Sequence, residues 1–323
     1  MLLWLLWLLW LCFVVVVVCW VCEPLAAFGC RDVELERLER EAWCESQEVH
    51  TSNEKQQQAP MVLSVVIPAY NEALRLPSML EGLAVYLNKR KRRGVEVLVV
   101  DDGSSDDTSG AALEAGKRLF APGDFRVARL AKNRGKGAAV REGAQRARGQ
   151  WILLADADGA TKIEDLDRLE KRAASEELKK PVIVVGSRAH LEKSEAVAKR
   201  SPLRNVLMRG FQALVKIVGG VRNVRDTQCG FKLFNRAALP LLKNLHLERW
   251  AFDVELLFLA QCEGAIIAEV PVTWSEIPGS KLSLLKDSLK MARDIACFRI
   301  AYKTGLWQRR PADFYKEDDK KHL

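Results

Sequence analysis

Two aspartates separated by one residue have the clearest chemical potential in this sequence. Asp156 and Asp158 follow the apolar run 151–155 (WILLA), which is typical of a buried strand. Both carboxylates can reach one hard divalent cation, and Mg²⁺ or Mn²⁺ is commonly held by one or two carboxylates plus substrate phosphate oxygens. Without a cation the two groups would repel and one would protonate. We therefore expect a Mg²⁺ or Mn²⁺ site here, with helix capping as the alternative.

The elements that must position these aspartates form a regular alternation. Helical stretches separate short β-branched runs, a pattern that predicts an α/β fold with a mostly parallel sheet covered by helices. We expect strands at 62–67, 95–100, 125–130, 151–155 and 182–186. We expect helices near 73–92, 105–118, 136–148 and 162–178.

Polar loops follow the carboxyl end of each expected strand. Because those ends line one edge of a parallel sheet, where ligands bind, the five loops should converge on one crevice. They are PAYNE (68–72), DDGSSDDT (101–108), AKNRGKG (131–137), DADG (156–159) and GSR (186–188).

Two of these loops suit a nucleotide. Asp101 and Asp102 can accept hydrogen bonds from ribose hydroxyls or a base N–H, and the same stretch also reads as a turn with a helix N-cap. Lys132, Arg134 and Lys136 offer cations, and the glycines between them let the backbone approach a phosphate. The loop lacks the full G-x-G-x-x-G pattern and does not follow the first strand, which argues against a dehydrogenase.

The N-terminal region suggests a membrane anchor. Residues 2–22 carry no charge, and about 20 such residues cross a bilayer core. The run is longer than the core of a cleaved signal peptide, which is the alternative, and no basic residue precedes it. Arg31, Arg37 and Arg40 follow it, so the positive-inside rule places the rest of the chain in the cytosol.

Charge divides the remaining chain. Residues 23–60 carry nine acidic and four basic residues and are expected to form a stalk, whereas residues 61–323 carry a net charge of +13. A basic domain suits anionic substrates or an anionic leaflet, and plain solubility accounts for the sign equally well. The eight cysteines show no disulfide or zinc framework.

The motifs VVIPAYNE, VLVVDDGSSDDT, ADAD, GSR, DTQCGFKLF and GSKLS occur in this order over roughly residues 62–284. In this order they resemble the inverting glycosyltransferases of family 2, which have the GT-A fold. LAKNRGKGAAVREG, DADGAT and RWAFDVELL are similar to the branch that acts on dolichyl phosphate. Ala160 stands where mannose-transferring relatives usually carry a metal-binding Gln, so a third protein ligand is not expected from that position.

The resemblance implies transfer of glucose from UDP-glucose to dolichyl phosphate for protein N-glycosylation, at the endoplasmic reticulum membrane and without nucleic acid. Mannose transfer from GDP-mannose and a non-catalytic nucleotide-sugar-binding protein are the alternatives. Together with the anchor and the stalk, we expect a 61–281 GT-A domain and a 282–323 C-terminal helix and tail, so the chain divides at 1–22, 23–60, 61–281 and 282–323. The residues at 282–304 predict a basic amphipathic helix, which either lies on the membrane or packs against the domain. The tail KKHL resembles a dilysine retrieval signal.

The resemblance also assigns individual residues. Those implied for the nucleotide are Pro68, Tyr70, Glu72, Asp101, Asp102, Asn133, Arg134 and Lys136. Those implied for the acceptor phosphate are Arg188, Arg204 and Lys281, and those implied for catalysis are Asp156, Asp158, Arg188, Asp226 and Asp253. Asp226, Asp253 and Glu255 lie among apolar residues and need partners, so they orient sugar hydroxyls or catalytic cations, or in the case of Glu255 form a structural ion pair.

Overall fold

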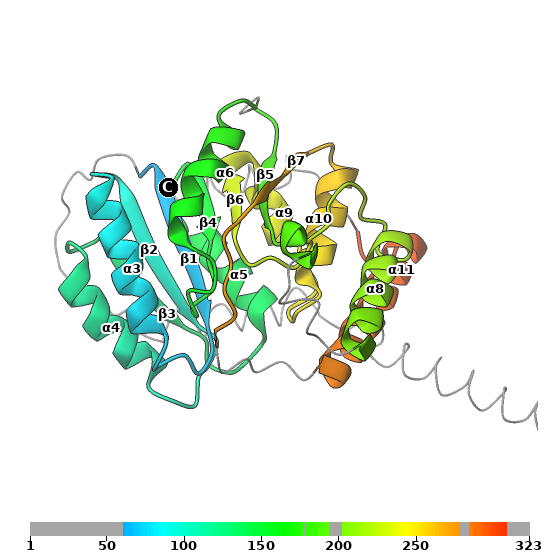
Figure 1. Ribbon diagram of the computed structural model, residues 1–323, viewed down its shortest axis with the longest axis horizontal. Coiled ribbons are helices and arrows are strands. Elements are labelled where there is room, and N and C mark those ends of the chain that lie inside the picture. The colour runs from blue at the N-terminus through cyan, green and yellow to red at the C-terminus, as the bar shows by residue number, and fades with distance from the viewer. Residues whose placement is uncertain (1–60, 177–178, 194–201, 278–283, 309–323) are drawn as a thin grey trace, which may run out of the picture.

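The computed structural model describes residues 61–176, 179–193, 202–277 and 284–308 of the 323-residue chain (Figure 1). Within these residues one seven-stranded sheet has the order β3-β2-β1-β4-β6-β5-β7. Its strands are β1 (Leu63–Ala69), β2 (Val95–Asp101), β3 (Phe125–Arg129), β4 (Trp151–Leu154), β5 (Val182–Ser187), β6 (Lys232–Asn235) and β7 (Ile266–Pro271).

The first five strands confirm the strands predicted from the β-branched runs, whereas β6 and β7 were not predicted. Strand β1 pairs in parallel with both β2 and β4, and β5 pairs in parallel with β7. Strand β6 lies between β4 and β5 and is antiparallel to both. It is only four residues long, KLFN, which is too short for alternation to reveal.

The helices connect these strands on both faces of the sheet. They are α3 (Leu76–Lys89), α4 (Thr108–Leu119), α5 (Lys136–Arg146), α6 (Leu166–Ala173), α8 (Pro202–Ile217), α9 (Leu239–Lys243), α10 (Phe252–Cys262) and α11 (Leu284–Thr304). Short 3₁₀ turns occupy η1 (Ile163–Asp165), η2 (Ala189–Lys193) and η3 (Arg236–Ala238). The four predicted helices are confirmed with shorter limits. Helix α3 begins three residues later than predicted, with Pro77 in its first turn, where a missing N–H costs nothing.

Two hydrophobic cores lie on the two faces of the sheet, because successive strand residues point to opposite sides. Val65 and Ile67 of β1 face a core built with α3, α4 and α6. Val66 faces the other core, which α5, α9, α10 and α11 complete. Figure 1 shows α3 and α4 at one end of the molecule, with α8 and α11 side by side at the other.

Helix α11 packs against the domain. Ile295, Phe298 and Ala301 are fully buried in the second core, and the helix contacts α8 and α10. Of the two interpretations of residues 282–304, the structure therefore supports packing for the face that carries these three side chains.

The predicted anchor 1–22, the stalk 23–60 and the KKHL tail lie outside the described residues and stay predictions. Among the helices that the structure does describe, none is long and apolar enough to span a membrane. The predicted domain limits stay predictions as well.

Close packing between α5 and β1 predicts a strong effect at Gly143. A Cβ added there would lie 2.4 Å from Cγ1 of Val66 and 3.0 Å from Cγ2 of Val100. Because both neighbours are buried, we expect Gly143→Ala to lower the free energy of unfolding by about 1–3 kcal/mol in urea titration. Gly82→Ala, at an exposed position of α3, is the control, since its Cβ meets nothing within 4 Å and it should stabilise by about 0.5–1 kcal/mol. Equal effects at the two sites would contradict the packing.

Candidate active site

A cavity of about 1620 Å³ lies at the edge of the sheet where the parallel strands end. The loops after β1, β2, β3, β4 and β5 all contribute to its wall, so the predicted convergence of these loops is confirmed. The predicted site residues that line it are Pro68, Tyr70, Glu72, Asp102, Asn133, Lys136, Asp156, Asp158, Arg188, Asp226 and Asp253.

The reversed direction of β6 adds a sixth loop to this edge. Because β6 is antiparallel to β4, its first residue lies where β4 ends, and Lys232 pairs with Leu154. The preceding segment 226–231 therefore packs against Asp156. A Cβ on Gly230 would lie 2.1 Å from Oδ2 of Asp156, so only a glycine allows this approach.

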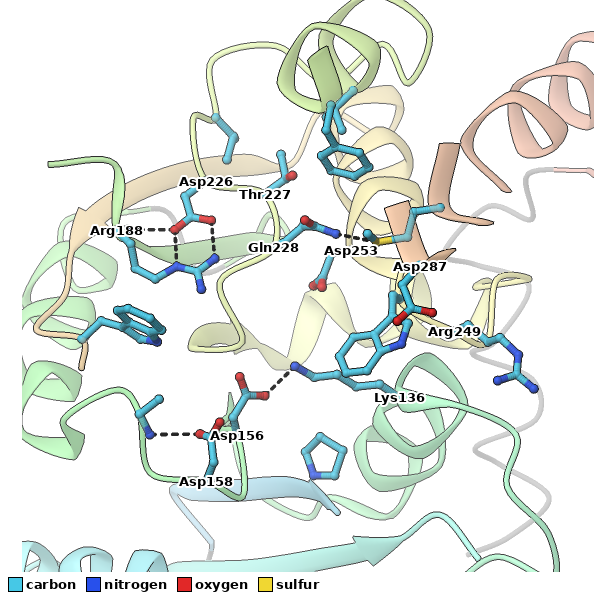
Figure 2. Close-up of a pocket in the computed structure, with 18 of the residues that line it drawn as sticks. Lys136, Asp156, Asp158, Arg188, Asp226, Thr227, Gln228, Arg249, Asp253 and Asp287 are labelled. Carbon is cyan, nitrogen blue, oxygen red and sulfur yellow. Dashed lines mark hydrogen bonds and ion pairs between the residues drawn. The ribbon is translucent and has the colours of Figure 1, made fainter. Parts of the chain in front are cut away.

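Asp156 forms an ion pair with Lys136, the first residue of α5. Its Oδ1 lies 2.5 Å from the Lys136 ammonium (Figure 2). Burial favours the neutral form of Asp156 and acts to raise its pKa. The combined attraction to Lys136, Lys232 and Arg188 outweighs this effect, so the pKa of Asp156 is lowered. Burial likewise acts to lower the pKa of Lys136, and its attraction to Asp156 and Asp253 raises it overall.

Asp158 lies beside Asp156, and its side chain contacts the backbone two residues further along the chain. One of its oxygens, Oδ1, accepts a hydrogen bond of 2.9 Å from the backbone N–H of Ala160 (Figure 2). Burial raises the pKa of Asp158, and repulsion from Asp156 adds to the rise. This contact closes a local turn and does not cap the following helix, since η1 begins at Ile163 after Lys162 and has no side-chain cap.

Asp253 forms a second, more deeply buried ion pair. The Lys232 side chain is fully buried, and its ammonium donates to Oδ1 of Asp253 at 2.5 Å and to the Cys229 carbonyl at 2.6 Å. Asp253 lies in the first turn of α10. Burial raises the pKa of Asp253, with Lys232 and Lys136 opposing. Lys232 was missed in the sequence because a lysine inside an apolar strand gives no sign of its partner.

Asp226 holds Arg188 at the opposite side of the cavity. It accepts hydrogen bonds from Nε of Arg188 at 2.7 Å, from Nη2 at 2.9 Å and from its backbone N–H at 2.8 Å (Figure 2). The guanidinium also lies over the Trp274 ring, 5.6 Å from its centre. Burial acts to raise the pKa of Asp226. The contacts with Arg188 act in the opposite direction and are stronger, so the pKa is lowered overall. Of the two roles considered for Asp226, the geometry fits the orientation of a cation.

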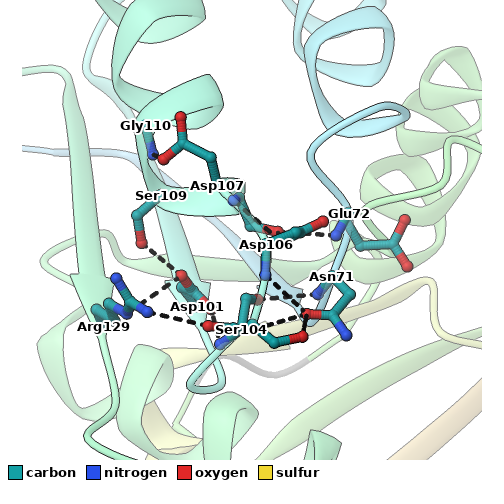
Figure 3. Close-up of polar contacts among 11 residues, drawn as sticks. Asn71, Glu72, Asp101, Ser104, Asp106, Asp107, Ser109, Gly110 and Arg129 are labelled. Atoms are coloured by element: carbon teal, nitrogen blue, oxygen red, sulfur yellow. Dashed lines mark hydrogen bonds and ion pairs between the residues drawn. The ribbon is translucent and has the colours of Figure 1, made fainter.

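Asp101 is turned away from the cavity. It is fully buried, accepts hydrogen bonds from the Ser104 N–H at 2.8 Å and from the Ser109 hydroxyl at 2.5 Å, and lies 3.7 Å from Arg129 (Figure 3). It does not line the cavity. The turn interpretation of this stretch therefore describes the contacts of Asp101, whereas the N-cap of α4 is Asp107.

Asp102 does line the cavity and also holds the basic loop. Its two carboxylate oxygens accept from the backbone N–H groups of Arg134 at 2.8 Å and Gly135 at 2.7 Å. Burial raises its pKa to about 6, against the effect of those two hydrogen bonds. Gly135 has φ of 113°, a backbone conformation that favours glycine, and it leads directly into Lys136.

Several predicted residues have other positions. Arg134 does not line the cavity, and its guanidinium pairs with Glu248. Glu255 is fully buried and accepts from the backbone N–H groups of His246 and Leu247, so its role is structural. The side chains of Arg204 and Lys281 lie outside the part of the chain whose side chains are described.

Other residues of the cavity wall were missed. Arg75 donates from Nε to Glu72 at 2.6 Å, and Trp250 lies 5.8 Å from the Lys136 ammonium, measured to the ring centre. Arg249 and Trp274 also line the wall. Trp274 follows β7, so recognising that strand would have added it to the loops at this edge.

The donor chemistry at Asp156 and Asp158 suits a hard divalent cation. In the described residues no group of three or more His, Cys, Asp or Glu side chains is arranged to hold a metal ion. Two neighbouring carboxylates still fit Mg²⁺ or Mn²⁺, which take the remaining ligands from water and substrate phosphates.

Comparison with known proteins gives a consistent result. Residues 64–240 match the family model described as "Glycosyl transferase family 2". The chain is 46% identical over 266 residues to the dolichyl-phosphate beta-glucosyltransferase of Saccharomyces cerevisiae, covering 79% of each protein. It is 49% identical over 253 residues to the enzyme of that name from Homo sapiens, covering 76% of this chain and 77% of the human protein.

Two solved structures share the fold at low identity. Mannosyl-3-phosphoglycerate synthase from Rubrobacter xylanophilus has a TM-score of 0.50 and 18% identity, covering 77% of each chain. Glucosyl-3-phosphoglycerate synthase from Mycobacterium tuberculosis, in complex with Mn²⁺, UDP and phosphoglyceric acid, has a TM-score of 0.50 and 18% identity, covering 76% of this chain and 79% of the other. These likenesses confirm the predicted α/β fold of GT-A type.

The raised pKa of Asp102 predicts a pH-dependent stability. Its pKa of about 6 in the folded protein exceeds the ordinary 3.8, so the folded state binds the proton more tightly. Stability from this group is present below pH 4 and lost as pH rises through about 6. Relative to Asp102→Asn, the free energy of unfolding of the wild type should fall by up to roughly 3 kcal/mol across this window, measured by urea titration. A difference that stays constant with pH would contradict it.

Proposed function

The chain belongs to glycosyl transferase family 2, and from that premise we propose that it transfers glucose from UDP-glucose to dolichyl phosphate. The observation that carries the proposal is the identity of 46–49% to proteins named dolichyl-phosphate beta-glucosyltransferase, over more than three quarters of both chains. The product is dolichyl β-D-glucosyl phosphate, used for protein N-glycosylation, with inversion at the anomeric carbon.

The nucleotide lies at the point where the sheet order reverses. Strand β1 has β2 on one side and β4 on the other, and ligands of open α/β sheets bind outside the carboxyl ends of strands at such a point. Pro68 at the end of β1, Tyr70 and Glu72 just after it, Asp102 after β2 and Asn133 after β3 line the cavity on the β1–β2–β3 side of this reversal. We assign them to the uridine. Asp102 contributes chiefly by holding the basic loop, because both of its oxygens accept backbone N–H groups.

The diphosphate lies against Asp156, Asp158 and Lys136. The two carboxylates would hold Mg²⁺ or Mn²⁺, whose charge stabilises the departing UDP when the metal is bound. The structure of glucosyl-3-phosphoglycerate synthase, which shares the fold and contains Mn²⁺ and UDP together, supports this assignment. Lys136 supplies a second cation. Its charge would stabilise the negative charge that develops on the leaving group in the transition state.

The acceptor phosphate lies near Arg188. A phosphate monoester has a second pKa of about 6 and is largely ionised at neutral pH, so no strong general base is needed. One of its oxygens attacks the anomeric carbon of glucose, and the bond from that carbon to the UDP oxygen breaks, leaving its electron pair on UDP. Asp226 fixes the Arg188 guanidinium so that its remaining N–H groups face the cavity. Arg204 and Lys281 are further candidates for this phosphate.

The substrate lipid requires a membrane location. We propose that residues 1–22 anchor the chain in the endoplasmic reticulum membrane and that the catalytic domain faces the cytosol. The uncharged length of this segment and the arginines that follow it support both parts of the proposal.

Transfer of label tests the donor and the aspartates together. Protein given dolichyl phosphate and Mn²⁺ or Mg²⁺ should move radiolabel into lipid from UDP-glucose and not from GDP-mannose. Asp156→Ala and Asp158→Ala should each reduce the rate by about 10²-fold or more, and chelator should abolish it. Glu164→Ala, an exposed carboxylate a few residues downstream, should leave it unchanged. Transfer from GDP-mannose would overturn the donor assignment.

The Arg188–Asp226 pair predicts an effect on the acceptor. Asp226→Asn keeps the shape but removes the charge that orients the guanidinium, so the KM for dolichyl phosphate should rise about tenfold. The Kd for UDP, measured by calorimetry, should not change. Glu81→Gln breaks an exposed pair with Arg118 and is the matched control. A rise in the Kd for UDP with an unchanged acceptor KM would place this pair with the donor instead.

A further inference from the structure

Four charged side chains form two adjoining ion pairs beside the cavity. Lys232 pairs with Asp253, and Lys136 pairs with Asp156 (Figure 2 shows the second pair). The two pairs interact electrostatically, since Asp253 acts to raise the pKa of Lys136 and Lys232 acts to lower the pKa of Asp156. Together the four groups carry no net charge.

The two pairs differ in access to the cavity. The Lys232 side chain is fully buried and is held by both Asp253 and the Cys229 carbonyl, so it is fixed. The Lys136 and Asp156 side chains retain 17% and 35% exposure. Lys136 also lies near the Trp250 ring and is carried on the N-terminal turn of α5, where backbone N–H groups favour an anion. Of the two ammonium groups, that of Lys136 is therefore the one with access to the cavity.

The contact of Lys136 involves the carboxylate assigned to the metal. Lys136 lies 2.5 Å from Oδ1 of Asp156. Two cations attracted to the same carboxylate repel each other, so a metal ion that arrives alone meets a site whose negative charge Lys136 has already reduced. A diphosphate changes this balance, because it offers Lys136 a new anionic partner within the same cavity.

We propose that Lys136 is a tethered counterion that occupies Asp156 in the nucleotide-free protein and moves to the diphosphate when the donor binds. The inference rests on the proposed function, because it takes Asp156 as a metal ligand and a nucleoside diphosphate as the leaving group. Metal and nucleotide then bind cooperatively, since each displaces Lys136 toward the position that favours the other. By linkage, UDP must raise the affinity for the metal by the same factor as the metal raises the affinity for UDP.

Direct Mn²⁺ titration tests the proposal without turnover. Free Mn²⁺ is measured by electron paramagnetic resonance in the full-length protein, with and without UDP. Lys136→Met should bind Mn²⁺ roughly tenfold more tightly than the wild type when UDP is absent. The factor by which UDP raises the Mn²⁺ affinity should fall by a similar amount in the variant. Unchanged or weaker Mn²⁺ binding by Lys136→Met without UDP would overturn the proposal.

Matched variants distinguish the effect of the positive charge at Lys136 from the effect of removing a positive charge elsewhere in the loop. Lys132→Met removes the same charge from an exposed position in the same loop and should leave Mn²⁺ binding near that of the wild type. Lys136→Arg keeps the cation and should retain the weak Mn²⁺ affinity of the wild type. Lys136→Gln is the second neutral variant, used if Lys136→Met does not fold, and it should repeat the tighter Mn²⁺ binding. A tightening by Lys132→Met equal to that of Lys136→Met would also overturn the proposal.

The two arms distinguish this inference from the proposed function. If the donor carries a different nucleotide, UDP will fail to raise Mn²⁺ affinity in wild type and variants alike, while the UDP-free comparison still decides the role of Lys136. If the protein transfers glucose from UDP-glucose yet Lys136→Met shows no gain in Mn²⁺ affinity, the proposed function stands and the counterion role fails.

Discussion

Every buried carboxylate at the edge of this sheet needs a compensating partner, and that requirement organises the cavity. An ionised carboxylate removed from water without a partner is strongly unfavourable. Asp156 has Lys136, Asp253 has Lys232 and Asp226 has Arg188. Each pair joins segments far apart in the chain, so the ion pairs fix the relative positions of the loops as well as their charge.

The direction of β6 makes these pairs possible. A parallel strand in that position would have brought its carboxyl end, not its beginning, to the cavity edge. Because β6 runs the other way, Lys232 lies beside the end of β4, and the segment with Asp226 and Gly230 closes over Asp156. One short antiparallel strand thereby joins Asp156 to the residues that hold Arg188.

The basic loop links the two halves of the cavity. Asp102, at the end of β2, accepts the backbone N–H groups just before α5, and α5 begins with Lys136 at Asp156. Asp102 is therefore connected through one turn, 134–135, to the ion pair of Lys136 with Asp156. This connection provides a structural path for the proposed counterion movement of Lys136.

The sequence by itself determined the class of fold, five of the strands, the loops that meet at one edge and the aspartate pair. These follow from local patterns, because alternation and the position of polar residues after a strand depend on neighbours in the chain. Only the tertiary structure decided that Asp101 is buried beneath a turn, that Arg134 pairs with Glu248, and that Lys232 pairs with Asp253. Lys232 and Asp253 lie 21 residues apart in the chain, and Arg134 and Glu248 lie 114 apart. Such pairing depends on strand order and direction, which local periodicity does not encode.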